Sequence, residues 1–184
     1  MNFIDFQDDA VKYERCLSSV RTEYQLPDKW FAYPDHLAVK CKDTESYLST
    51  IELIKPQLDL ETLGEIDQAG RRLASGSFSD PMRLGDYLFE MIEIMEPKPN
   101  SSLIEYTFVE HAEFTVNDLL TVISDLNGKV SASDKTVKVV DGRASHHPGI
   151  LLEFSDGLEV KFNEMNLARM VADEKRRKIW RKIK

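Results

Sequence analysis

The sequence contains two similar stretches, and this internal repeat limits the possible folds more than any other feature does. In each stretch, an alternating segment with an early histidine precedes a helical segment and then further strand candidates. The two histidines, His36 and His111, stand 75 residues apart. Repeats of one supersecondary unit usually pack side by side into a continuous sheet. The repeat therefore predicts an α+β fold in which two βαβββ units form a curved mixed sheet around a central cup.

The first βαβββ unit is expected over residues 31–99. Residues 35–41 alternate between two faces, as a half-buried strand does. Asp43-Thr44 then supplies the N-cap of a helix. A loop-rich stretch with short strands is expected over 58–83, and a strong strand over 86–95 completes the unit.

The second unit is expected over residues 104–163. Residues 109–116 form its opening strand, with the histidine in the same early position. Asn117 can cap a helix that ends in a left-handed turn at Asn127-Gly128. The strand candidates that follow are 129–132 with 136–140, then 150–154 and 158–162, the last two joined by a hairpin turn at Ser155-Asp156-Gly157.

Two helices extend this repeat, and the whole of 1–184 is expected to be a single domain. The N-terminal extension, 1–26, has one apolar stripe at three- and four-residue steps: Phe3, Phe6, Ala10, Tyr13, Leu17 and Val20. The stripe is expected to dock either on the domain or on a second subunit, which would make a homodimer. A C-terminal helix with a basic end is expected over 164–184.

Charge and composition exclude several classes of partner and compartment. The net charge is −8, although residues 173–184 carry seven basic side chains and two acidic ones. The acidic body would repel phosphates, so no specific nucleic-acid binding is expected. No apolar run reaches the roughly 18–20 residues that cross a bilayer, so no membrane partner is expected either. Two cysteines without a CxxC pair and an acidic start without signal-peptide features predict a cytoplasmic protein.

Strand parity predicts which side chains face the cup. Leu88, Ile92 and Ile94 suit the helix-covered side, which leaves Tyr87, Phe89, Met91 and Glu93 for the cup. The same parity adds polar residues from three other strands: His36, Lys40, His111, Glu113, Glu159, Lys161 and Asn163. Two imidazoles and one or two carboxylates suit Zn²⁺, Ni²⁺, Mn²⁺ or Fe²⁺.

These residues also permit an interpretation without a metal. Each histidine can instead be half-buried and hydrogen-bonded to Glu93 or Glu113. A carboxylate at Glu93, on a largely apolar strand, needs a cation or donors. A metal would serve, and so would Lys40, Arg71 or Lys161. The loop pair His146-His147 fits solvent or the mouth of the cup better than chelation. The sequence has no G-x-S-x-G motif, P-loop or glycine-rich dinucleotide fingerprint.

Several stretches resemble the YecM-like branch of the vicinal-oxygen-chelate (glyoxalase-like) superfamily. Asp35-His36-Leu37-Ala38-Val39-Lys40-Cys41 is similar to that family's opening strand, Asp-His-aliphatic-Ser-Leu-Arg-Cys. Glu110-His111-Ala112-Glu113 resembles its Glu-His-Ile-Glu strand, and residues 69–94 are similar to its middle section. Asp156-Gly157 and Val160-Lys161-Phe162 resemble its Asp-Gly and Ile-Lys-Phe ending. The resemblance covers about residues 30–175.

The resemblance implies a divalent-metal site in the cup. Vicinal-oxygen-chelate proteins take ligands from the first and fourth strands of each unit, which implies His36, Glu93 and His111 here. Asn163 departs from the pattern, because the family tends to carry a His there and glyoxalases a Glu. An Asn is a poor transition-metal ligand and a good hydrogen-bond partner, so Asn163 is expected to contact either a metal ligand or the substrate.

Three functions stay open at the level of sequence. The first is a metal-dependent isomerase, lyase or dioxygenase for a small polar metabolite, in which Glu113 or Glu159 moves a proton. The second is a non-catalytic small-molecule-binding protein with a weak or absent metal. In both, the residues expected to hold an anionic or polar ligand are Lys40, Arg71, Lys161 and Asn163. The third is an interaction module that uses the N-terminal stripe and the basic end.

Overall fold

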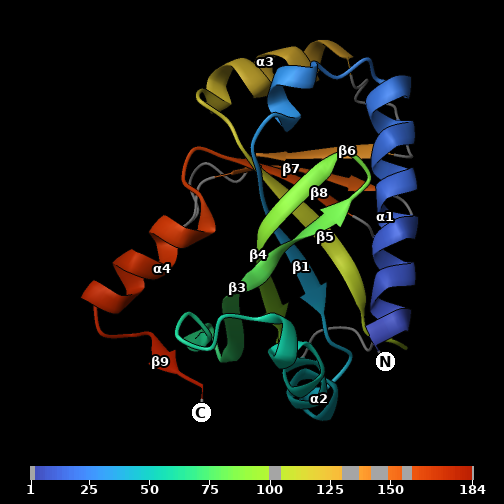
Figure 1. Cartoon of the computed structure of the whole chain (residues 1–184). Helices are drawn as coiled ribbons and strands as arrows, with labels where there is room; N and C mark the ends of the chain where they lie inside the picture. Colours follow the sequence, from blue (N-terminus) through green and yellow to red (C-terminus); the bar gives the residue numbers. More distant parts are fainter. Residues whose placement is uncertain (1–2, 100–104, 130–136, 142–148, 155–158, 184) are drawn as a thin grey trace.

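A computed structural model describes residues 3–99, 105–129, 137–141, 149–154 and 159–183. These residues form a nine-stranded mixed sheet with the strand order β6-β7-β8-β5-β1-β4-β3-β2-β9 (Figure 1). The strands are β1 (Pro34–Lys40), β2 (Gly64–Gln68), β3 (Arg71–Leu84), β4 (Tyr87–Met95), β5 (Phe108–Thr115), β6 (Val137–Asp141), β7 (Gly149–Phe154), β8 (Glu159–Asn163) and β9 (Arg181–Lys182). The α-helices are α1 (Phe3–Glu23), α2 (Thr44–Ile54), α3 (Leu119–Lys129) and α4 (Leu167–Arg176). The α+β class and the curved mixed sheet are confirmed.

The two βαβββ units meet at the centre of the sheet through their opening strands. β1 pairs antiparallel with β5, and each also pairs in parallel with the last strand of its own unit, β4 or β8. His36 is in register with Met91 on β4, and His111 is in register with Glu159 on β8. The two histidines therefore occupy equivalent places, as the repeat predicted.

The main core lies on the face of the sheet that α1, α2 and α3 cover (Figure 1). On α1, Tyr13 and Leu17 are each 1% exposed and pack into it. The Tyr13 hydroxyl donates to the backbone oxygen of Glu159 (2.5 Å) and accepts from the backbone N–H of Ala112 (2.8 Å). The N-terminal helix thus docks on its own chain and ties β5 to β8. Association into a homodimer stays a prediction.

Local signals explain the start of each unit's helix. Asp43 caps α2 by accepting from the backbone N–H of Ser46 (2.7 Å), as expected. In the second unit the cap is Asp118 instead of Asn117, because the Asp118 carboxylate accepts from the N–H groups of Leu120 and Thr121. A carboxylate at this position also suits the positive end of the helix dipole.

Two further expectations for individual elements were wrong. The stretch expected to hold short strands contains β3, a single strand of 14 residues, because β4 supplies hydrogen-bond partners on both sides of a register shift. Helix α3 continues through Asn127-Gly128 to Lys129, whose ammonium group binds the backbone oxygen of Gln25 (2.5 Å). The expected turn at 155–157, the histidine pair 146–147 and residues 130–132 of the strand candidate 129–132 lie outside the described residues.

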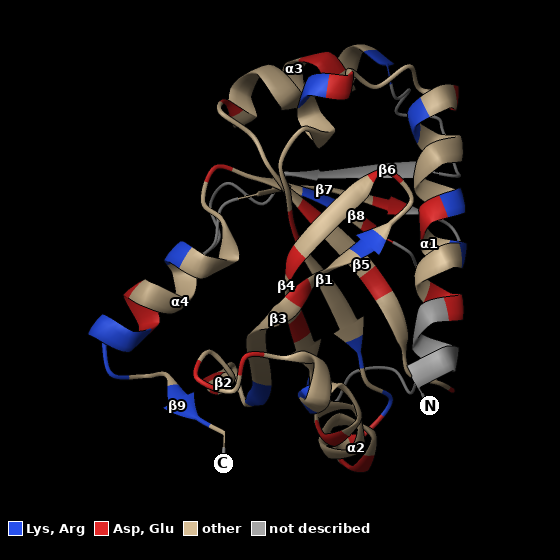
Figure 2. Cartoon of the chain, viewed as in Figure 1, with Lys and Arg blue, Asp and Glu red and all other residues tan. Residues whose placement is uncertain are grey.

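The basic end also differs from its expected form. α4 ends at Arg176, and the chain then returns as β9, which pairs antiparallel with β2 at the edge of the sheet (Figure 2). Lys182 pairs with Glu61 (2.7 Å), and Lys175 lies over the Trp180 ring, 4.1 Å from its centroid. The contacts that β9 and Trp180 make with the rest of the chain therefore outweigh the tendency of α4 to continue beyond Arg176. None of the described helices is long and apolar enough to span a bilayer.

Candidate functional site

The concave side of the sheet encloses a cavity of about 520 Å³, which is of the size that small-molecule sites have. α4 borders this cavity with Leu167 and Met170, while the other three α-helices lie on the opposite face. The rest of the wall is largely polar and charged. Its polar members are His36, Lys40, Gln68, Arg71, Glu93, Lys98, Glu110, His111, Glu113, Glu153, Glu159, Lys161 and Glu174.

Strand register explains which of these side chains meet. His36 on β1 is directly opposite Glu113 on β5, and Glu113 is directly opposite Lys161 on β8. His111 stands two residues before Glu113, so both point to the same face of β5. The central pair of strands therefore brings both histidines to one carboxylate.

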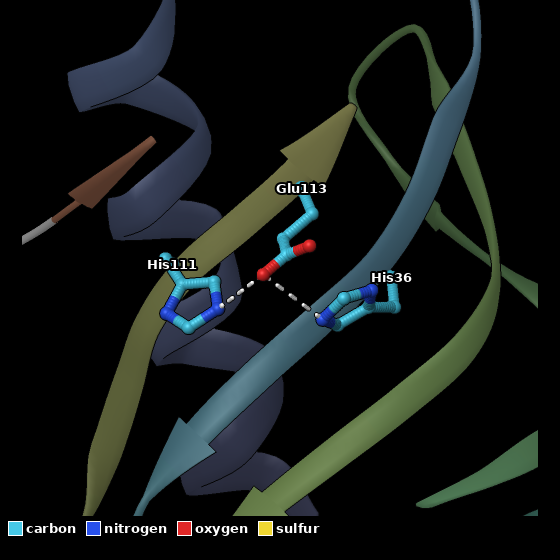
Figure 3. A group of neighbouring side chains, drawn as sticks. All are labelled: His36, His111 and Glu113. Atoms are coloured by element: carbon cyan, nitrogen blue, oxygen red, sulfur yellow. Dashed lines mark ion pairs between the residues drawn. The ribbon is translucent and has the colours of Figure 1, made fainter. Parts of the chain in front are cut away.

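His36, His111 and Glu113 form a compact buried group (Figure 3). One Glu113 oxygen lies 3.6 Å from His36 Nε2 and 3.3 Å from His111 Nε2. One ligand atom from each residue lies within 4.8 Å of the other two. The His36 and Glu113 side chains are each 2% exposed and that of His111 is 8% exposed. Bulk water is thus largely excluded from the group.

The imidazoles of this group have no hydrogen-bond partners among the described residues. All four ring nitrogens of His36 and His111 are buried and unpaired by hydrogen-bond geometry, although carboxylate oxygens lie 3.3–3.6 Å away. Buried polar nitrogens are rarely left without partners. These four nitrogens therefore mark a place where a proton network or a bound ion completes the structure.

Glu113 is held by two further groups from β8. Lys161 forms an ion pair with one carboxylate oxygen, and the Asn163 amide donates to the other. Burial alone would raise the pKa of Glu113, but the charges of His36 and Lys161 hold that pKa well below its usual range. The lowered pKa favours the ionised form of Glu113 and makes it a weak base.

The same carboxylates act on the histidines. Burial alone would lower the pKa of His111, but its contacts with Glu110 and Glu113 raise that pKa to about 10. Burial alone would also lower the pKa of His36, but the charge of Glu113 and the contact with Asp35 raise that pKa above its usual value. Without an ion, these contacts favour the cationic form of both imidazoles, which balances the buried negative charge. A metal ion would have to displace their protons.

The donor set fits a divalent metal ion. Two imidazoles and one carboxylate are the ligands of common catalytic Zn²⁺ and non-haem Fe²⁺ sites. The ring nitrogens of His36 and His111 make no hydrogen bond among the described residues, so the protein leaves them available to bind an ion. The carboxylate of this group is that of Glu113, whereas the resemblance implied Glu93 as the carboxylate ligand.

Glu93 and Arg71 line the cavity without joining this compact group. Lys40 also lines the cavity and forms an ion pair with Glu110. Asn163 is fully buried and its amide turns to Glu113. The position of each sequence-predicted residue is thus described, but its role stays a prediction.

The aromatic wall expected in the cup lies elsewhere. Tyr87 and Phe89 pack in the main core against Phe114, with ring centroids 5.3 and 5.9 Å apart. The expectation that they face the cup was wrong. β4 and its partner β3 shift register between Phe89 and Met91, which breaks the simple alternation along the strand.

Glu174 is a cavity residue that the sequence interpretation missed. It lies on α4 one turn after Met170, and the carboxyl is buried against the concave face. Burial first and then the nearby charge of Glu93 raise the pKa of Glu174 to about 7. The signal was present in the sequence, because Glu174 falls on the apolar stripe of an amphipathic helix.

Solved structures with the same fold are known. One, described as a structural-genomics protein EC4020, is 17% identical and gives a TM-score of 0.76 over 92% of this chain and 91% of that one. Methylmalonyl-CoA epimerase from Mycobacterium tuberculosis is 15% identical, with a TM-score of 0.50 over 79% of this chain and 95% of that one. At these identities the likeness shows the fold alone. No model of a protein family and no curated protein matches the sequence.

Proposed function

We propose that this chain is a YecM-like protein whose cup binds one divalent metal ion and acts on a small polar metabolite. The observation that carries the proposal is the group of His36, His111 and Glu113, in which four buried ring nitrogens have no hydrogen-bond partner among the described residues. Such a group inside a cavity of about 520 Å³ is suited to hold a metal ion that in turn contacts a small molecule.

The metal ligands in this proposal are His36 Nε2, His111 Nε2 and a Glu113 oxygen. Glu93 lines the same cavity and would be an additional ligand, as the superfamily resemblance implies. Glu113 was the expected proton carrier, but its strongly stabilised charge suits it better to hold a cation. Asn163 and Lys161 then orient the Glu113 carboxylate, as partners of metal ligands commonly do.

Proton transfer is assigned to Glu174. Its pKa of about 7 lets the carboxyl accept or donate a proton near neutral pH, and it borders the cavity. A divalent ion held by the three ligands would polarise a substrate carbonyl oxygen. A cavity carboxyl that can take a proton favours an isomerase or a lyase over a dioxygenase.

The ligand itself would be an anionic or polar metabolite. Lys40, Arg71 and Lys98 line the cavity and place positive charge around it. Arg71 opens β3 directly after the tight turn at Ala69 and Gly70, which both have positive φ angles, so the short hairpin fixes its place at the rim. These cations would hold a carboxylate or phosphate group of the metabolite.

A second candidate function is a metal-free binding protein. The observation that favours it is the ion pair between Lys161 and Glu113, because the ammonium group already supplies a positive charge beside the carboxylate. In that case the imidazolium rings and Lys161 would together bind an anion, and no bond of the ligand would change.

Metal binding by the purified protein tests the first proposal. We expect one Mn²⁺ or Zn²⁺ per chain in calorimetric titrations, and Glu113→Gln should weaken the affinity at least about tenfold by removing the ligand charge. The matched control is Glu90→Gln, because Glu90 is exposed on β4 and does not line the cavity. Absence of binding by the wild-type protein, or equal losses in the two variants, would leave the metal-free function.

Proton exchange tests whether the site is catalytic. The metal-loaded protein would be incubated with 2-hydroxy and 2-oxo acids in D₂O, and deuterium at the carbon next to the carbonyl would be followed by NMR. We expect exchange that Glu174→Gln lowers by roughly 10²-fold or more, which is the usual effect of a general base. Saturable binding of these acids without any exchange would favour the binding protein.

A further inference from the structure

A second set of possible ligands lies beside the first and shares one of its residues. Glu110, His111 and Glu159 offer one atom each, and these atoms all lie within 4.8 Å of one another. This set uses Nδ1 of His111, whereas the first set uses Nε2. Nδ1 lies 3.4 Å from a Glu110 oxygen and 3.9 Å from a Glu159 oxygen, and it has no hydrogen-bond partner among the described residues.

The chain builds this second set with a local irregularity in β5. Ala38 on β1 pairs with His111, while the next residue, Val39, pairs with Val109, so Glu110 is an extra residue in a β-bulge. The bulge turns Glu110 to the same side as His111, where simple alternation would direct it to the main core. Lys40 holds one oxygen of Glu110 and leaves the other toward His111.

Glu159 completes the set from the neighbouring strand. It is directly opposite His111 in the parallel pairing of β5 and β8, and its side chain is 23% exposed toward the cavity. Oxygens of Glu110 and Glu159 thus lie 3.4 and 3.9 Å from His111 Nδ1, an arrangement of two carboxylates and one imidazole that suits a divalent cation.

The chemistry of imidazole links the two sets. A neutral imidazole offers one nitrogen to a metal, while the other carries a hydrogen that needs an acceptor. If His111 binds an ion through Nδ1, its Nε2–H faces Glu113 at 3.3 Å. If it binds through Nε2, its Nδ1–H faces Glu110 at 3.4 Å. Either choice gives the carboxylate support that metal-binding histidines usually have.

We propose that Glu110, His111 Nδ1 and Glu159 form a second position for a divalent cation, which excludes the first because the two share His111. This inference rests on the proposed function, since it assumes that the cup takes a metal at all. With two carboxylates and one imidazole, the second position suits Mn²⁺ or Zn²⁺. One ion per chain would then occupy either side of His111.

Mn²⁺ titration followed by EPR separates the two positions. His36→Gln removes a ligand of the first position only, so this variant should still bind one Mn²⁺, with an affinity within roughly tenfold of the wild type. Adding Glu159→Gln should weaken the remaining binding at least about tenfold further. The matched control adds Glu153→Gln instead, because Glu153 is directly opposite Glu159 on β7 and belongs to neither set.

The outcomes distinguish this inference from the proposed function. Loss of all binding in His36→Gln, or equal effects of the Glu159 and Glu153 changes, would overturn the second position while the first stands. Absence of Mn²⁺ binding by the wild-type protein would overturn both. Thermal melting reports whether each variant folds. If His36→Gln does not fold, His36→Ala removes the same ligand in its place and carries the same expectations.

Discussion

The two βαβββ units share one framework but differ in charge at equivalent positions. Two residues after the histidine of each opening strand, the parallel partner is Glu93 in the first unit and Lys161 in the second. The first unit therefore contributes a negative charge to the cup where the second contributes a positive one. In the second unit, this cation pairs with Glu113 of its own opening strand. Backbone symmetry thus does not produce a symmetric site.

The opening strands differ as well. β1 gives the cup His36 and Lys40, while β5 gives it Glu110, His111 and Glu113. The extra acid comes from the β-bulge in β5. Negative charge therefore gathers on the second unit, and Lys40 and Lys161 balance it. The repeat therefore determines where side chains lie, whereas single substitutions and one β-bulge determine what those side chains bind.

Replacing Lys161 should break this balance and give the largest effect. Lys161→Met leaves the buried Glu113 without its ammonium partner, which should lower the free energy of unfolding by about 3 kcal/mol in the presence of EDTA. Saturating Mn²⁺ should restore part of that loss, because the ion would supply the missing positive charge. Urea denaturation with and without Mn²⁺ measures both effects.

The matched control for Lys161→Met lies in the first unit. Glu93→Met changes the equivalent position, but it removes a charge for which the described residues provide no ion pair within 4.0 Å. Its effect on the free energy of unfolding should be within about 1 kcal/mol of zero. Equal losses in the two variants would show that the two positions are equivalent in energy as well as in register.

A second test concerns the helix that ties the second unit together. Tyr13 of α1 bridges Ala112 on β5 and Glu159 on β8, so Tyr13→Phe removes both hydrogen bonds and keeps the packing of the ring. The backbone N–H of Ala112 then loses this partner, and the free energy of unfolding should fall by roughly 1–3 kcal/mol. Tyr33→Phe is the control, because that side chain is exposed. Similar melting of both variants would contradict the bridge.

Much of the framework could be predicted from the sequence, because its signals are local. Alternation placed His36 and His111 on equivalent strands, and Asp43 marked the start of α2. The polar residues Ser75 and Asp80, together with Pro81, disguised the long strand β3, since its hydrogen bonds depend on a distant partner. Hydrophobic periodicity therefore predicted the elements whose signal lies within their own segment. It failed for β3, because the length of that strand depends on pairing with β4.

The candidate site could be predicted only in part for the same reason. The cup-facing parity of Glu93 and Glu113 was visible, but the choice between them depends on the register of β1 against β5. The bulge that turns Glu110 into the cup has no signal in the sequence pattern. Glu174 was not predicted, because only the apolar residues of α4 were expected to face inward.

The smallest expected effect links the two units through Glu174. Below about pH 4.5 this carboxyl is protonated in both the folded and the unfolded chain, and above about pH 7 it is ionised in both. Between these values the folded protein keeps a proton that the unfolded chain releases, so the free energy of unfolding falls as the pH rises. Glu174→Gln should remove this loss and stabilise the protein at pH 8 relative to pH 5 by about 1 kcal/mol, after allowing for solvent screening.

Because the charge of Glu93 contributes to the raised pKa of Glu174, Glu93→Gln should reduce the same pH dependence, and Glu90→Gln should not. Urea denaturation of the three variants at both pH values, with EDTA present, measures this coupling. If Glu93→Gln leaves the pH dependence unchanged, then burial alone raises the pKa of Glu174. In that case the charge of Glu93 on β4 has no effect on the titration of Glu174 on α4.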